Sequence, residues 1–72
     1  MTREELGGRL KTLREDLDVT QQDLAERTGL HQVEISKLER GERGVSIDKL
    51  LQYMNGLSFE LLFQHTGNRK HV

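Results

Sequence analysis

The side chains best suited to recognising another molecule lie close together in the chain. Gln32, Val33, Ser36 and Lys37 are spaced so that a helix would carry them on or beside one face, because residues three and four apart are neighbours on a helix surface. Gln can bond adenine through two atoms, an aliphatic side chain can contact a thymine methyl, and Lys can reach guanine or a phosphate. A helix face with these residue types could therefore contact the edges of DNA bases.

Catalysis and metal binding have little support in the sequence. The chain has no cysteine, and its three histidines, His31, His65 and His71, do not share a ligand spacing. No Ser/His/Asp arrangement or carboxylate pair stands outside the helical surface pattern. We therefore expect no enzymatic activity, no metal and no cofactor.

The elements that must position the candidate residues are helices. Capping boxes at Thr2 with Glu5 and at Thr20 with Asp23 mark two helix starts. Glycines mark the ends of the last three helices. The first helix is predicted to be amphipathic, with a single apolar face of Leu6, Leu10, Leu13 and Leu17. The predicted helices are residues 3–16, 21–28, 32–40 and 47–55.

A different pattern follows the fourth helix. Leu57, Phe59, Leu61 and Phe63 alternate with other residues in the two-residue period of a half-buried strand. A lone strand cannot satisfy its own amide groups, so its simplest partner is its own copy across a two-fold axis. The alternative is a fifth short helix that carries Phe59, Leu62 and Phe63 on one face.

The chain is short enough that all 72 residues are expected to form one domain. We divide it into a helical core (1–56), a dimerisation strand (57–64) and a flexible tail (65–72). No apolar run reaches the roughly 20 residues of a membrane span, and the first residues do not read as a signal peptide, so a cytoplasmic, nucleoid-associated protein is expected. The net charge of −1 neither requires nor excludes a DNA partner.

The stretch TQQDLAERTGLHQVEISKLERGERGVSIDKLL, preceded by LKTLRE, resembles the lambda-repressor/Cro-like (XRE) helix-turn-helix family. The pattern T-Q-x-x-L-A, then G, then I-S-x-x-E-x-G carries the resemblance, which covers residues 6–57. The resemblance implies an all-α, four-helix lambda-repressor-like DNA-binding domain, here with a C-terminal β-strand that pairs across a homodimer. Its third helix would enter the major groove of double-stranded DNA.

The matching positions suggest a role for each candidate residue. The residues expected to contact bases are Gln32, Val33, Ser36 and Lys37. Arg14 and Glu39 are expected to form an ion pair between helices. Phosphate contacts are expected from Thr20, Gln21, Arg40 and Arg43.

Several of these roles have an alternative. Thr20 could serve only as a cap beside an exposed Gln21, and either arginine could be solvated surface. Glu34 could accept from a cytosine or simply solubilise the helix. His31 replaces the usual Ser or Thr cap, so it either weakens the third helix or contacts a phosphate.

The segment SIDKLLQYMNGLSFELLFQ carries a narrower resemblance, to HipB-type antitoxins. This resemblance implies a homodimer built by the strand that contains Phe59, Leu61 and Phe63. The dimer would repress its own operon through an inverted-repeat operator and bind a HipA-like kinase toxin. Two alternatives stay open: a stand-alone phage-type or restriction-controller regulator, and a protein-interaction module that does not bind DNA.

Overall fold

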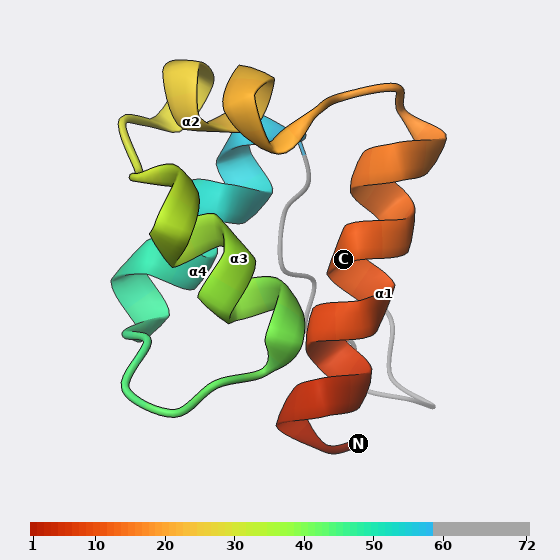
Figure 1. Cartoon of the computed structure of the whole chain (residues 1–72), viewed down its shortest axis with the longest axis vertical. Coiled ribbons are helices and arrows are strands. Elements are labelled where there is room, and N and C mark those ends of the chain that lie inside the picture. Colours follow the sequence, from red (N-terminus) through yellow and green to blue (C-terminus); the bar gives the residue numbers. More distant parts are fainter. Residues whose placement is uncertain (59–72) are drawn as a thin grey trace, which may run out of the picture.

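The computed structural model describes residues 1–58, and these form four α-helices (Figure 1). They are α1 (Arg3–Asp16), α2 (Gln21–Thr28), α3 (Gln32–Arg40) and α4 (Ile47–Gly56). The predicted all-α, four-helix class is confirmed, and α4 extends one residue further than the sequence suggested.

The predicted strand over 57–64 does not begin where we placed it. Leu57 is buried and caps α4, and Ser58 turns the chain with a φ of 64°. The alternation counted Leu57 as a strand residue, whereas its side chain belongs to the helical core. The other strand residues, Phe59, Leu61 and Phe63 among them, and the tail 65–72 lie outside the described residues.

Local hydrogen bonds set the helix boundaries. The Thr2 hydroxyl accepts from the Glu5 amide at 3.1 Å while the Glu5 carboxylate accepts from the Thr2 amide at 2.9 Å, and Thr20 and Asp23 form the same reciprocal box. Each box satisfies two amides that a helix start would otherwise leave without a partner. At the end of α2, Gly29 takes φ 80°, a left-handed conformation that costs glycine little, and this starts the turn into α3.

The helices pack around one core. α1 lies along α3, while α2 packs against both α3 and α4 (Figure 1). Leu24, Ile35 and Tyr53 are fully enclosed. The buried apolar residues come from every helix and from the connections between them: Leu10, Val19, Leu24, Leu30, Ile35, Tyr53 and Leu57.

The leucine face predicted for α1 is only partly buried. Of its four leucines, Leu10 alone is enclosed, and Leu6, Leu13 and Leu17 stay between 37% and 49% exposed. The residues of α1 that are buried are Gly7, Leu10 and Arg14, so the contact with α3 lies to one side of the leucine face. The periodicity located the apolar face correctly but not the line along which α3 approaches it.

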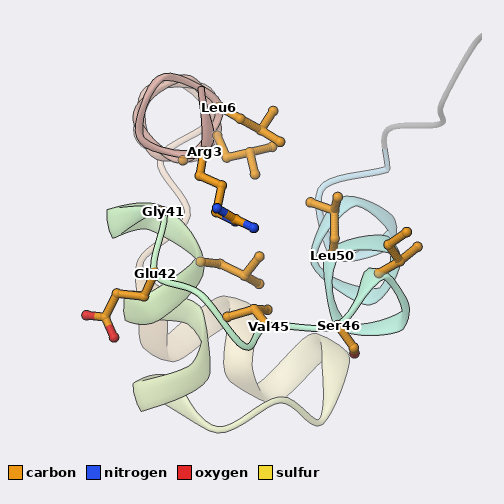
Figure 2. Close-up of a pocket in the computed structure, with 11 residues that line it drawn as sticks. Arg3, Leu6, Gly41, Glu42, Val45, Ser46 and Leu50 are labelled. Atoms are coloured by element: carbon orange, nitrogen blue, oxygen red, sulfur yellow. The ribbon is translucent and has the colours of Figure 1, made fainter. Parts of the chain in front are cut away.

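A hollow of about 170 Å³ lies between α1 and the start of α4 (Figure 2). Leu6 borders it from α1, Val45 from the α3–α4 loop, and Ile47 and Leu50 from α4. Ile47 is 71% exposed. Residues 1–58 therefore carry an apolar surface that stretches from α1 to α4.

Candidate nucleic-acid interface

α2 and α3 are two short helices joined by the three-residue turn 29–31, which is the geometry of a helix-turn-helix. Ile35 fastens α3 to the core with no exposed surface. Away from this buried residue, Gln32, Lys37 and Val33 are exposed, Val33 by 59%, and Ser36 is half-buried. The structure thus brings the four residues expected to read bases onto the outward side of α3.

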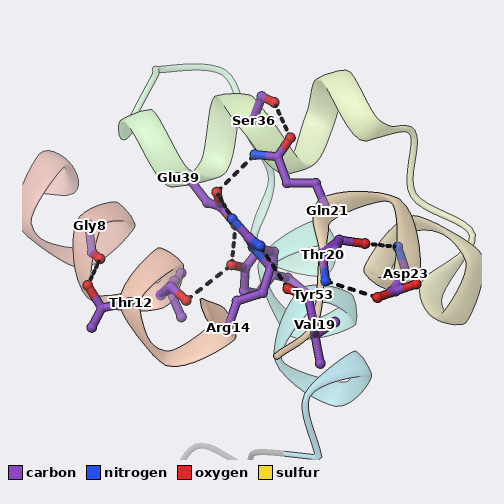
Figure 3. A network of polar contacts seen from close by, with 11 residues as sticks. Gly8, Thr12, Arg14, Val19, Thr20, Gln21, Asp23, Ser36, Glu39 and Tyr53 are labelled. Atoms are coloured by element: carbon purple, nitrogen blue, oxygen red, sulfur yellow. Dashed lines mark hydrogen bonds and ion pairs between the residues drawn. The ribbon is translucent and has the colours of Figure 1, made fainter. Parts of the chain in front are cut away.

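A buried carboxylate lies behind this surface (Figure 3). Glu39 and Arg14 are each 6% exposed, and the Arg14 Nε donates to Glu39 Oε2 at 2.6 Å while Nη2 donates to Oε1 at 3.1 Å. Tyr53 donates its hydroxyl to Oε2 at 2.6 Å, and Gln21 donates its amide to Oε1 at 2.9 Å. Arg14 also reaches the Val19 carbonyl at 2.8 Å. The expected ion pair is therefore present as the centre of a network that joins all four helices.

The network keeps its acid and its base charged. Burial raises the pKa of Glu39, but hydrogen bonds from Arg14, Tyr53 and Gln21 outweigh it and hold that pKa below the usual value. The hydrogen bond to Glu39 raises the pKa of Arg14. Burial is the main reason that the pKa of the Tyr53 hydroxyl is raised. Tyr53 thus stays a neutral donor to an ionised carboxylate.

Gln21, expected to contact phosphate, also bonds inside the protein. Its side-chain nitrogen donates to Glu39, and its oxygen accepts from the Ser36 hydroxyl at 2.9 Å. An amide nitrogen carries two hydrogens, so one is left for another partner. Gln21 is also the first residue of α2, where backbone amides point away from the helix and favour an anion. Thr20 adds its hydroxyl at the same helix start, where it accepts from the Asp23 amide.

The two arginines expected to clamp phosphate differ in their surroundings. The Arg40 Nε contacts Glu42 Oε2 at 2.7 Å, with both side chains about half exposed. Such a surface pair is weak and competes with a phosphate for the guanidinium. Lys37 and Arg43 make no ion pair within residues 1–58. Lys37 on α3 and Arg43 just after it are therefore two cations that no carboxylate of residues 1–58 neutralises.

Glu34 has structural partners. Its carboxylate accepts from the His31 amide at 2.9 Å and from the Lys49 ammonium, and these two bonds, the one from Lys49 foremost, lower its pKa. The His31 side chain makes no capping hydrogen bond. Glu34 therefore supplies the half of a capping box that binds the His31 amide, and it links α3 to α4.

Three contributors to this region were missed in the sequence. Tyr53 offered a signal, because a lone tyrosine three residues after Leu50 on an apolar helix face needs a partner for its hydroxyl. Lys49 offered none, since its partner Glu34 lies on another helix. Glu42 offered a short-range signal, because it follows its partner Arg40 by two residues.

The described part of the chain contains no group of three or more His, Asp or Glu placed to hold a metal ion. None of its four helices has the length and apolar character needed to cross a membrane.

Comparisons with known proteins agree with this geometry. HipB in the HipA-HipB-O2-O3 complex superposes with a TM-score of 0.81 at 21% identity, over 92% of this chain and 93% of that one, and so shares the fold. The restriction-modification controller protein C.Esp1396I, a tetramer in complex with its natural 35 base-pair operator, gives a TM-score of 0.71 at 32% identity, over 79% and 75% of the two chains. A point mutant of that controller gives 0.71 at 30% identity, over 83% and 80%.

The search of curated proteins gives no match. Residues 5–61 match the family described as helix-turn-helix domain, which is most of the chain. The exposed face of α3 and the turn at Gly29 are features of a helix-turn-helix, and these matches point to the same structure. The chain belongs to the helix-turn-helix domain family and is of the lambda-repressor/Cro-like (XRE) type.

Proposed function

We propose that the protein is a sequence-specific transcriptional repressor that binds an inverted-repeat operator as a homodimer. The outward side of α3 carries the proposal, because it offers Gln32, Val33, Ser36 and Lys37 together while Ile35 holds the helix to the core. Two copies related by a two-fold axis would place their α3 helices in successive major grooves, about 34 Å apart. A dimer bound over a promoter would exclude the polymerase.

In this proposal the residues have separate tasks. Gln32, Val33, Ser36 and Lys37 contact base edges. The start of α2, with Thr20 and Gln21, contacts one phosphate group, and the end of α3, with Arg40 and Arg43, contacts another.

DNA binding is tested by fluorescence anisotropy with duplexes from upstream of the protein's own gene. Affinity for the preferred site should fall steeply with salt, by a slope of about 0.9 for each phosphate contact. Gln32→Ala should cost about 1–3 kcal/mol on that site and relax selectivity at one base pair. An equal loss on random DNA would refute base readout by Gln32.

The homodimer is proposed to form through the segment that contains Phe59, Leu61 and Phe63. The apolar surface between α1 and α4 supports such an association, because a single copy leaves it in water. Phe59→Asp should give monomers and weaken operator binding, since it puts a charge into the dimer core. A dimer that persists in sedimentation experiments with Phe59→Asp would contradict this route.

We further propose that the protein is the antitoxin of a HipA-like kinase. The match to HipB over nearly the whole length of both chains supports this role. The higher identity to C.Esp1396I supports a second candidate, a controller-type regulator with no toxin partner.

Capture of the tagged protein from its native host separates the two roles. The lysate is kept in low salt with nuclease, and the captured proteins are identified by mass spectrometry. A stoichiometric kinase-like protein favours the antitoxin role. A protein recovered alone, which still binds its own upstream DNA, favours the controller role.

A further inference from the structure

A row of hydrogen bonds runs from the buried ion pair to the outward side of α3. Glu39 Oε1 accepts from Gln21 Nε2 at 2.9 Å, and Gln21 Oε1 accepts from Ser36 Oγ at 2.9 Å (Figure 3). The two bonds share the Gln21 amide, so the orientation of that amide sets the donor and the acceptor in both of them. The direction of the row therefore decides what Ser36 can offer to a further partner.

The direction is set at Glu39. An ionised carboxylate only accepts hydrogen bonds. Both Glu39 oxygens already accept from Arg14, and Oε2 also accepts from Tyr53. Gln21 must therefore turn its NH₂ group toward Glu39, because the opposite amide orientation would place two acceptor oxygens together in a half-buried site.

The orientation of Gln21 then determines the role of Ser36. With its nitrogen on Glu39, Gln21 presents its oxygen to α3, and the Ser36 hydroxyl donates to it. A serine hydroxyl has a single hydrogen, so the Ser36 oxygen has only lone pairs left. Ser36 lies next to the exposed Gln32 and Val33 on the outward side of the helix.

Resting on the proposed function, in which α3 lies in the major groove, we propose that Ser36 reads DNA as a hydrogen-bond acceptor only. Its partner is then a base with an exocyclic amino group, adenine through N6 or cytosine through N4. Guanine and thymine present only acceptors and a methyl group in that groove. Gln21 is the positioning residue that imposes this preference.

Selection of binding sites from random duplex DNA tests the proposal. The wild type should prefer adenine or cytosine at one position of each half-site. The affinity ratio between preferred and other bases should be about fivefold, the effect of one net hydrogen bond, and Ser36→Ala should lose it. On the selected site, replacing the amino group of that base with hydrogen should weaken the wild type about fivefold and leave Ser36→Ala unchanged.

Gln21→Met provides a second test, because it keeps the side-chain length and removes the acceptor that holds the Ser36 hydrogen. Its selected sites should extend to guanine or thymine at that position. The matched control is Gln22→Met, an exposed neighbour on α2, whose sites should be those of the wild type.

Three results would overturn the proposal: a Ser36-dependent preference for guanine or thymine, no change of preference in Ser36→Ala, or no effect of removing the amino group. None of these three measurements needs a Gln21 variant, so poor folding of Gln21→Met does not impair the test. A wild type without salt-sensitive DNA binding would instead overturn the proposed function itself.

Discussion

The Tyr53 hydroxyl on α4 and the Glu39 carboxylate on α3 lie 2.6 Å apart, and Arg14 of α1 donates to both oxygens of the same carboxylate. Three helices thus meet at one ionised group behind the outward side of α3. A small domain buries only a small apolar core. The position of α3 therefore depends strongly on the junction that Tyr53, Glu39 and Arg14 form.

Removing parts of the junction should destabilise the domain in a definite order. Tyr53→Phe loses one hydrogen bond to a charged group and should lower the free energy of unfolding by about 1.5–3 kcal/mol. Glu39→Ala leaves Arg14 buried without its partner and should cost on the order of 3–5 kcal/mol. Urea unfolding gives both values.

Glu26→Ala serves as the control for that order, because Glu26 is exposed on α2, and it should change stability by less than about 0.5 kcal/mol. A Tyr53→Phe domain as stable as the wild type would show that the hydroxyl contributes nothing to the junction.

The same carboxylate makes stability depend on acid. The folded state holds the pKa of Glu39 below its usual value of 4.5, so its stabilisation is complete above that value. The stabilisation is lost as the pH falls through the lowered pKa, because the folded state must then take up a proton. Urea midpoints measured from neutral pH down to acid should show this loss.

Glu39→Gln is the reference for the acid dependence, since it cannot titrate. Its stability should fall less steeply below pH 4.5 than that of the wild type. The pKa values of Asp23 and Glu34 are lowered too, so some acid dependence should persist in the variant. Equal slopes in the two proteins would contradict the role given to Glu39.

The adjacent glycines of α1 should respond oppositely to alanine. A Cβ on Gly7 would lie 2.5 Å from the carbonyl oxygens of Leu38 and Glu39, so Gly7→Ala should push α1 away from α3 and destabilise the domain. A Cβ on Gly8 meets nothing within 4 Å, so Gly8→Ala should stabilise by about 0.5–1 kcal/mol through helix propensity. Thermal unfolding followed by circular dichroism compares them. Two shifts of the same sign would contradict the close approach.

Glu42 should weaken the proposed DNA contact of Arg40. Glu42→Gln removes a negative charge beside the guanidinium, so affinity for any DNA sequence should rise and its salt dependence should steepen. Arg43→Ala should weaken binding on all sequences and lower the salt slope by about 1. Anisotropy titrations at several salt concentrations measure both.

The Arg40→Ala variant gives the matching control for this pair. Combined with Glu42→Gln, it should cancel the steeper salt dependence, because the released guanidinium is gone. A gain in affinity that survives in the double variant would assign the effect to general charge rather than to Arg40.

The helices and their limits were predictable because their determinants are local. Thr20 and Asp23 are three residues apart and cap the same turn, and Gly29 takes its left-handed conformation within the same segment. The placement of the four residues expected on the outward side of α3 could also be predicted, since helical spacing alone puts them there. Such contacts between near neighbours in the chain need no knowledge of the packing.

The partners across helices were decided by the tertiary structure. Spacing showed that α1 has a leucine face, but only packing determined that Gly7 and Arg14 lie against α3 while Leu13 stays exposed. Only packing brings Tyr53 onto Glu39 and turns the Gln21 amide toward both Glu39 and Ser36. A sequence specifies what one helix offers, whereas hydrogen-bond partners from distant segments depend on how the helices approach one another.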